Sequence, residues 1–183
     1  MRAFLYVAGQ TVGWFACILG AAGSLRWLGV PVVAALFVLH LIARGERSVR
    51  RILTLTMVSM LFGFAFDSLL IVCGVYEPVR WVIPSPFATI WLVALWVNFA
   101  LIVDVPLGWL QEHLVVAAGF GGIFGPLAYW AGRRLGAIEM AEPITFSVAV
   151  LAVAWALGLA AFMFLARQSQ VLSWRKKATT TSQ

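Results

Sequence analysis

Six long and almost wholly apolar stretches run along this chain, separated by short polar connections. They lie at residues 3–22, 27–43, 52–76, 87–103, 114–131 and 144–166, and the fourth reaches 110 if its helix continues past Pro106. A helix of about 20 apolar residues crosses the hydrocarbon core of a bilayer. Lipid cannot satisfy backbone hydrogen bonds, so spans of this kind are helical. The pattern predicts an all-α fold, a polytopic transmembrane helix bundle of about six spans.

The fifth stretch is the weakest of the six, because small residues and a proline crowd its middle. These are Gly119, Gly121, Gly122, Gly125 and Pro126. Gly121 and Gly125 have the spacing that lets two membrane helices pack closely. The alternative is an unwound segment whose carbonyl groups line a cavity. Of the two interpretations, we favour close packing.

The chain is expected to form one domain with its two ends on the same side of the membrane. Residues 1–166 form the single bundle, and 167–183 form a polar cytoplasmic tail that we expect to be disordered. We expect the first stretch to be retained rather than cleaved as a signal peptide, because it is long and contains Gln10 and Thr11. With six spans, nine Lys and Arg residues lie on the side of the two termini and four on the other. Cytoplasmic loops are rich in these residues, so both termini are predicted to be cytoplasmic.

Composition excludes several classes of protein. Of the 183 residues, 63% are hydrophobic and 11% are charged, and the mean hydropathy is +0.98. A soluble domain carries about 25% charged residues and cannot hide this much apolar surface. Nucleic acid is excluded as a partner, because the cations behind the net charge of +6 sit in short clusters rather than along one face. Cys17 and Cys73 lie in apolar runs without CxxC spacing, and we expect them to act as packing residues.

Many aromatic residues lie near the predicted ends of the spans. Amphipathic rings favour the headgroup layer of a membrane, so we interpret these residues as an interfacial belt. They are Trp27, Tyr76, Trp81, Trp109, Tyr129, Trp130 and Trp174, whereas Trp14, Trp96 and Trp155 fall inside spans.

Four segments in a fixed order carry a family resemblance. They are Gln-Thr-Val-Gly-Trp-Phe-Ala-Cys at 10–17, Asp-Ser-Leu-Leu at 67–70, Trp-Leu-Val-Ala-Leu-Trp-Val-Asn-Phe at 91–99 and Gly-Pro-Leu-Ala-Tyr at 125–129. Together they resemble the DUF2878 family of small bacterial inner-membrane proteins over nearly the whole chain. The resemblance implies a multi-pass protein of the bacterial inner membrane, and it implies no reaction.

Asp67 is the strongest candidate for a functional side chain, because it lies deep in the third stretch. A charged group at mid-membrane costs about 2.5–3.5 kcal/mol on insertion scales, so it should face the bundle interior and have a partner. Ser59 and Gly63 share its helical face. Asn98 lies at a similar depth in the fourth span and is the expected partner, with Gln10 as the other nearby amide. The predicted site is a buried polar cluster of these three residues, which either fixes helix packing or handles a proton or substrate.

Asp104 is expected to lie outside this cluster. It follows Asn98 by six residues and therefore occupies another helical face. We expect it at a solvated cytoplasmic boundary together with Glu112 and His113.

The remaining candidates are cationic or imidazole side chains. Arg133 and Arg134 follow the fifth span and are candidates for binding lipid phosphate. His40 and His113 lie at similar predicted depths, which would suit the two axial ligands of a haem. Both are close to water, so we disfavour a bis-His haem. No His, Cys or carboxylate stands three or four residues from either histidine, so we expect no metal site and no cofactor.

Two function classes remain open, and the sequence does not decide whether the chain is an enzyme. The first is a non-catalytic protein that binds membrane lipids or another membrane protein, for example as an accessory to a lipid-modifying system. The second is a small transporter or intramembrane enzyme that works through Asp67, Asn98 and Gln10.

Overall fold

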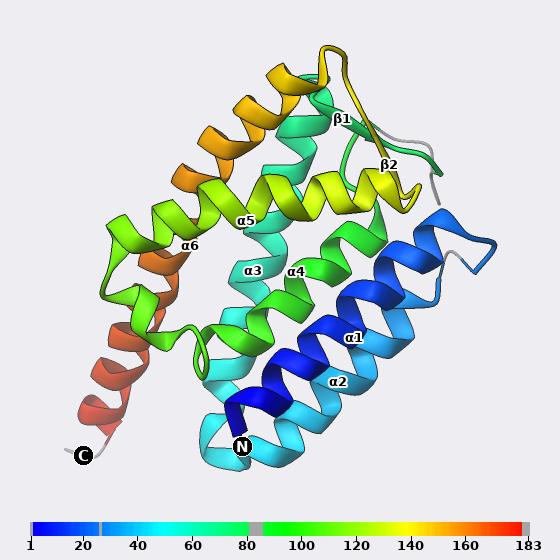
Figure 1. The fold of residues 1–183 in the computed structure, drawn as a ribbon. Helices are drawn as coiled ribbons and strands as arrows, with labels where there is room; N and C mark the ends of the chain where they lie inside the picture. The colour runs from blue at the N-terminus through cyan, green and yellow to red at the C-terminus, as the bar shows by residue number, and fades with distance from the viewer. Residues whose placement is uncertain (1, 26, 81–85, 181–183) are drawn as a thin grey trace.

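The computed structural model describes residues 2–25, 27–80 and 86–180, with side chains described apart from those of 2, 47 and 170–180. Within these residues the chain forms α-helices, one short 3-10 helix (η1) and two short strands (Figure 1). In chain order they are α1 (Arg2–Ala22), α2 (Gly29–Arg44), α3 (Glu46–Val72), β1 (Tyr76–Pro78), α4 (Ile90–Val103), η1 (Gly108–Gln111), α5 (Leu114–Arg134), β2 (Ile138–Met140) and α6 (Ile144–Thr180). The predicted all-α helix bundle is confirmed. Trp81, from the predicted aromatic belt, lies outside the described residues.

Four helices are long and apolar enough to cross a membrane, and two are shorter. The four candidate spans are Ala3–Ala22, Ser48–Val72, Leu114–Arg134 and Ile144–Ser169. α2 has 16 residues and α4 has 14. A 14-residue helix extends about 21 Å, which is less than the hydrocarbon thickness of about 30 Å. The predicted count of six spans therefore stays a prediction.

α4 is apolar on all sides because other helices surround it. Nine of its 14 residues are buried. A helix that is hydrophobic all round belongs in a protein interior rather than at a surface. Its apolar sequence therefore reflects a central position in the bundle.

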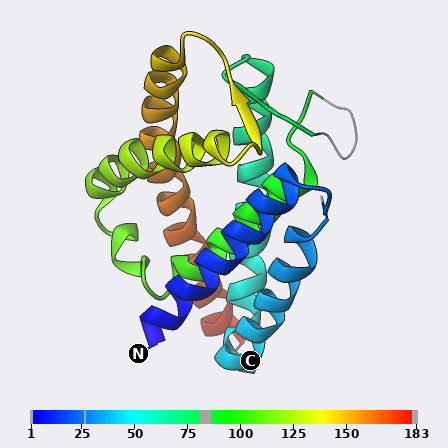
Figure 2. The same cartoon turned by 45° about the vertical axis from the view of Figure 1, so that its right-hand side comes forward.

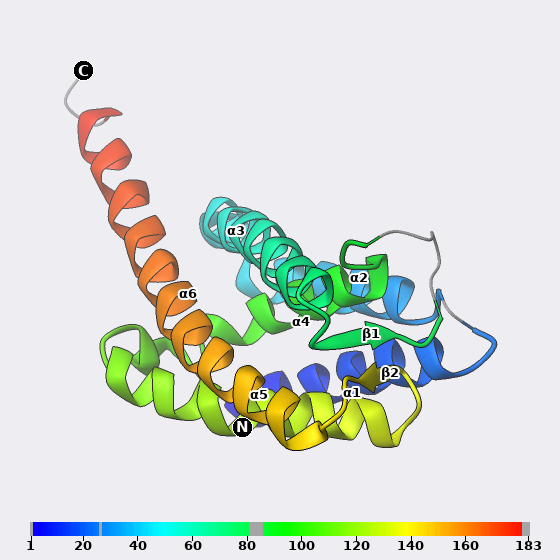
Figure 3. The ribbon, with the colours of Figure 1, turned by 90° about the horizontal axis from the view of Figure 1, so that it is seen from above.

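The helices form two groups that meet at α3. α1, α2 and α4 pack together, α5 packs along α6, and α3 contacts both α4 and α6. Figure 2 shows α5 crossing in front of α6, with α1 and α2 side by side. Figure 3 shows the same two groups from above. This arrangement leaves α5 facing α1 and α4 across the interior.

A two-stranded antiparallel sheet joins the segment after α3 to the segment after α5. β1 and β2 are antiparallel, with Tyr76 opposite Met140. Gly74 and Gly136 precede the two strands with φ of 68° and 81°, a left-handed backbone that glycine adopts without strain. The predicted third span, 52–76, therefore ends earlier than expected, and Tyr76 belongs to the strand.

Glycines of α5 allow its close approach to α6. A Cβ added at Gly121 would lie 2.1 Å from the backbone oxygen of Trp155, and one at Gly125 would lie 2.2 Å from the Cγ of the Trp155 ring. α5 is continuous from Leu114 to Arg134 with Pro126 inside it. The packing interpretation is therefore confirmed, and the unwound alternative is wrong.

The C-terminal segment differs from the prediction. α6 continues from Ile144 to Thr180, so residues 167–180 are helical rather than disordered. These residues contain no Gly or Pro and include the good helix formers Gln, Leu, Arg, Lys and Ala. Polarity alone therefore did not end the helix.

We predict that Gly125→Ala destabilises the bundle whereas Gly119→Ala does not. The added methyl at Gly125 overlaps the Trp155 ring, and overpacking of this kind costs about 1–3 kcal/mol. A Cβ at Gly119 meets nothing within 4 Å, and replacing a helical glycine by alanine is otherwise favourable. Unfolding in detergent, followed by tryptophan fluorescence, measures both variants. Equal stabilities would contradict the close packing of α5 on α6.

Candidate functional site

The carboxylate of Asp67 is buried and accepts hydrogen bonds from three side chains. The residue is 1% exposed. The Tyr76 hydroxyl donates to Oδ1 at 2.7 Å, and the Trp96 indole Nε1 donates to Oδ2 at 2.7 Å. The Tyr129 hydroxyl donates to Oδ1 as well. The donors come from β1, α4 and α5, so one side chain of α3 connects three other elements.

This set of donors explains how a carboxyl group can be buried in an apolar bundle. Leaving such a group unpaired in a low-dielectric interior is strongly unfavourable, and hydrogen bonds offset that cost. A carboxylate has about four acceptor positions. Three described donors fill most of them, so Asp67 is well satisfied by the protein itself.

Asn98 is not the partner of Asp67, so the predicted contact is wrong. The Asn98 side chain is fully buried and donates from Nδ2 to the backbone oxygen of Gln10 at 2.9 Å. Trp96 and Asn98 are two residues apart, which places them on opposite sides of α4. Trp96 therefore faces α3, and Asn98 faces α1. The rotation of α4 decides which of its residues meets Asp67.

Trp96 packs on the small-residue face of α3 that the sequence predicted. The Ser59 hydroxyl donates to the Trp96 backbone oxygen at 2.7 Å. A Cβ added at Gly63 would lie 2.0 Å from the Cγ of the Trp96 ring. Together with Asp67, these residues give the indole a polar contact and room to lie flat against the helix.

Trp96 and Trp155 form a parallel stack at the centre of the molecule. Their ring centroids are 5.3 Å apart, with an interplanar angle of 5°. Gly63 backs the first ring and Gly125 backs the second. The stack therefore joins the group of α1, α2 and α4 to the pair of α5 and α6.

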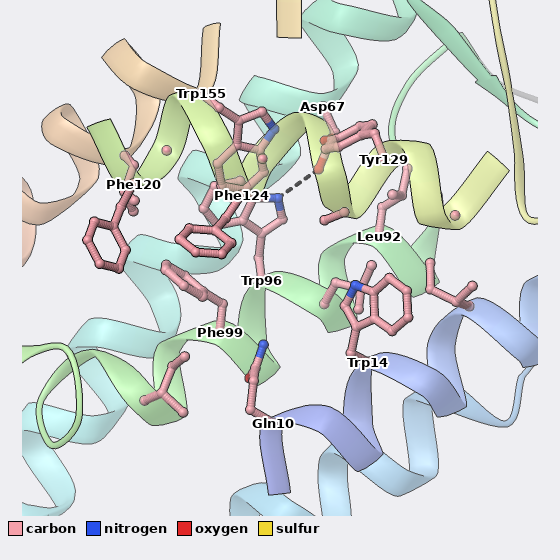
Figure 4. Close-up of a pocket in the computed structure, with 18 of the residues that line it drawn as sticks. Gln10, Trp14, Asp67, Leu92, Trp96, Phe99, Phe120, Phe124, Tyr129 and Trp155 are labelled. Atoms are coloured by element: carbon pink, nitrogen blue, oxygen red, sulfur yellow. Dashed lines mark hydrogen bonds between the residues drawn. The ribbon is translucent and has the colours of Figure 1, made fainter. Parts of the chain in front are cut away.

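A mostly apolar cavity of about 350 Å³ lies beside this stack, and Asp67 forms part of its wall. Figure 4 shows Phe99, Phe120 and Phe124 gathered on one side, and Asp67, Tyr129 and Trp155 on another. α1, α4 and α5 supply most of the lining, and α3 and α6 contribute Asp67, Trp155 and Leu159. We refer to it as the central cavity.

The rim of the central cavity is apolar and reaches the outside of the bundle. Phe120 and Phe124 line the cavity and are 37% and 58% exposed. Trp109 packs edge-on against Phe120, with ring centroids 6.0 Å apart. The cavity is therefore bordered at the outside of the bundle by the exposed aromatic side chains Phe120 and Phe124 of α5.

Gln10 lines the same cavity as Asp67 from the opposite side. In Figure 4 its amide points into the cavity from α1. Its Oε1 atom and the Oδ1 atom of Asn98 are buried without a hydrogen-bond partner among the described residues. A Cβ at Gly13 would lie 2.3 Å from Asn98 Oδ1, so α1 and α4 are in close contact here. The predicted cluster is thus divided into an Asp67 part and a Gln10–Asn98 part.

Asp104 is paired rather than solvated, which corrects the prediction for it. Arg51 Nη2 lies 2.8 Å from Asp104 Oδ1, and Arg51 Nε donates to Oδ2 at 3.0 Å. The same guanidinium donates to the Ala166 backbone oxygen at 2.9 Å and to the Ser169 hydroxyl. The side chains of Arg51 and Asp104 are 14% and 13% exposed. This network joins α3, the end of α4 and α6.

The other sequence candidates lie away from the central cavity. His40 is buried with its ring against Tyr6, whereas His113 is exposed and its Nδ1 lies 2.8 Å from the Trp109 backbone oxygen. In the described part of the chain, no three His, Cys, Asp or Glu side chains are grouped to hold a metal. Arg133 and Arg134 lie in the last turn of α5, and the Arg134 guanidinium is 5.7 Å from the centroid of the Trp130 ring.

Comparison with known families identifies the chain. The model of the family described as "Protein of unknown function (DUF2878)" matches residues 5–161. The chain belongs to the DUF2878 family. Neither a search of curated proteins nor a search of solved structures returns a significant match. The match covers Asp67 and the three residues that donate to it in this DUF2878 protein, but the family description assigns them no role.

The sequence did not indicate the tyrosines of this site. Tyr76 and Tyr129 lie near the ends of apolar stretches and were interpreted as headgroup-layer residues, yet they are 1% and 9% exposed. Their rings meet edge-on, with centroids 4.9 Å apart. The turn at Gly74, closed by the hydrogen bond from Val75 N to Leu70 O, redirects the chain after α3, and Tyr76 then lies in β1. No local pattern signals a strand of three residues.

We predict that Asp67→Leu destabilises this DUF2878 protein more than Asp67→Asn. Leucine leaves two hydroxyls and an indole N–H buried without an acceptor, at a combined cost of about 3 kcal/mol or more. Asparagine keeps one oxygen for Trp96, and its amide can donate to a rotated tyrosine hydroxyl. Denaturant unfolding in detergent measures the difference, with Tyr129→Phe as the variant that removes one donor. A leucine variant as stable as the asparagine variant would contradict the geometry.

We also predict energetic coupling between Arg51 and Asp104. Replacing one member of a nearly buried ion pair leaves the other charge without a partner, at a cost of about 3 kcal/mol. The double variant Arg51→Met/Asp104→Leu should therefore be more stable than the sum of the single effects indicates. A double-mutant cycle of unfolding free energies tests this expectation. Strict additivity would show that the pair contributes nothing.

Proposed function

We propose that this protein is a non-catalytic lipid-binding protein of the bacterial inner membrane, which takes the hydrocarbon chain of a membrane lipid into the central cavity. The observation that carries this proposal is the apolar opening beside Phe120 and Phe124. A volume of about 350 Å³ lies within the range of small-molecule sites.

The position of the opening favours a ligand that arrives from the bilayer. Val115, Ile123 and Leu127 on the outer face of α5 are 87%, 61% and 52% exposed. Exposed apolar side chains of a membrane helix face hydrocarbon. A chain of the surrounding lipid therefore reaches the opening without crossing water, and an apolar wall suits it.

The polar groups of the cavity favour binding over chemistry. The acceptor positions of Asp67 are largely occupied by Tyr76, Trp96 and Tyr129. Such a carboxylate is held in place rather than free to exchange a proton. Gln10 Oε1 has no hydrogen-bond partner among the described residues. The amide of Gln10 can accept a hydrogen bond from a ligand or donate one to it.

A small transporter or intramembrane enzyme is the second candidate, and one observation favours it. Asp67 and Gln10 line one cavity although they do not touch, which is the arrangement a substrate between them would need. Under this alternative Asp67→Asn abolishes activity in a protein that remains folded. Under lipid binding the same change leaves lipid occupancy largely intact.

The orientation and partners form part of the proposal. We propose that both termini lie in the cytoplasm, as the distribution of Lys and Arg predicts for six spans. Arg133 and Arg134 are then at the opposite surface, where they contact lipid phosphate beside Trp130. A second membrane protein, such as a lipid-modifying enzyme, is the partner to which a bound lipid would be presented.

Photo-crosslinking in nanodiscs tests the cavity directly. A phospholipid with a diazirine on its acyl chain should label Leu92 of α4, which is 4% exposed and lines the cavity. Lipid around the protein should instead label exposed residues such as Leu61, which is 71% exposed. Mass spectrometry of the peptides separates the two labels.

A filled cavity supplies the control. Ala128 lines the central cavity, and we predict that Ala128→Phe removes the label on Leu92 while the label on Leu61 persists. Ala161→Phe adds the same ring at an exposed site of α6 and should leave both labels unchanged. Labelling of Leu61 alone in the unaltered protein would refute the proposal.

A further inference from the structure

A second cleft lies between α1 and α2, at the end of the bundle where α1 begins and α2 ends. Its volume is about 680 Å³, and α4 contributes Leu101 to its lining. Its apolar lining includes Leu36 and Leu39. Tyr6, His40 and Arg44 lie toward the end of the two helices. We refer to it as the α1–α2 cleft.

His40 is a buried polar side chain that lacks a partner. The residue is 8% exposed, and its Nδ1 atom is buried without a hydrogen bond among the described residues. Its ring meets Tyr6 edge-on, with centroids 5.4 Å apart, which fixes its orientation but does not satisfy the nitrogen. Buried polar atoms nearly always have a partner, so an orphaned one in a cleft wall points to a ligand.

Arg44 supplies a positive charge beside His40. It is exposed in the last turn of α2 and makes no ion pair among the described side chains. The nearby carboxylate of Asp104 is bound to Arg51 instead. A guanidinium binds phosphate oxygens in pairs, and this one is available.

The order of these groups matches an amphiphile aligned with the helices. Leu36 and Arg44 are eight residues apart on α2, which corresponds to about 12 Å along the helix. We propose that the α1–α2 cleft binds an anionic phospholipid, with its phosphate against Arg44 and His40 and its chain over Leu36 and Leu39. The end with Arg44 is the predicted cytoplasmic one, where basic residues meet anionic lipid.

This site is distinct from the central cavity, although Gln10 lines both. The central cavity has no cation in its lining. The α1–α2 cleft has an open cationic end and so selects a headgroup as well as a chain. Filling the central cavity with Ala128→Phe should therefore leave headgroup preference unchanged.

Native mass spectrometry of the delipidated protein tests the proposal. Titration with phosphatidylglycerol and with phosphatidylcholine should show tighter binding of the anionic lipid. Arg44→Gln should weaken phosphatidylglycerol binding about tenfold, the size expected for loss of a charged hydrogen bond. Arg50→Gln removes the same charge from an exposed site at the same end and should have little effect.

A second variant tests the apolar part of the cleft. Gly9 lines the cleft, and a Cβ there meets only Leu36 Cδ2, at the ordinary contact distance of 3.6 Å, so we expect the side chain of Gly9→Leu to occupy the cleft. It should weaken binding of both lipids in a folded protein. Equal affinities for the two lipids, equal effects of Arg44→Gln and Arg50→Gln, or full displacement of lipid by inorganic phosphate would overturn the proposal.

Discussion

A carboxylate with almost no exposed surface determines where several parts of this bundle lie. Asp67 would be strongly unfavourable in an apolar interior without hydrogen-bond donors, so Trp96, Tyr76 and Tyr129 must all reach it. The contact with Trp96 sets the rotation of α4. The contact with Tyr76 sets the course of the chain after α3, and the contact with Tyr129 sets the position of α5. The turn at Gly74 redirects the chain after α3, and Tyr76 pairs with Met140 in the two-stranded sheet.

The central cavity follows from the same constraint. Trp96 lies flat on Gly63 because Asp67 binds its indole nitrogen, and Trp155 stacks on Trp96 while Gly125 leaves it space. The two stacked indoles lie between α4 and α6. The remaining gap on the side of α1 is lined by aromatic rings and opens beside Phe120 and Phe124. The hydrogen bond between Asp67 and Trp96 thus joins α3 to α4 and also fixes the ring that borders the cavity.

Hydropathy was sufficient to predict the helices, and the cost of burying charge was sufficient to predict that Asp67 faces inward. The small-residue faces with Gly63 and Gly125 were also predictable, since helical spacing alone defines them. The partners of Asp67 were not predictable, because Trp96 and Asn98 lie close together on α4 and only tertiary packing sets the rotation of that helix. Tyr76 lies in a strand of only three residues. The pairing of Asp104 depends on Arg51, which comes from a segment that the sequence indicated as a loop. Contacts between distant elements leave no periodic trace in the sequence.

A crystal structure of the protein grown from a lipid mesophase would show whether the three donors surround Asp67 and whether the cavity holds a lipid chain. We expect Asp67 within hydrogen-bond distance of Trp96, Tyr76 and Tyr129, with elongated density between α1, α4 and α5. A structure in which α5 closes against α4 with no space between them, or in which the Asp67 side chain faces the surrounding lipid, would contradict it.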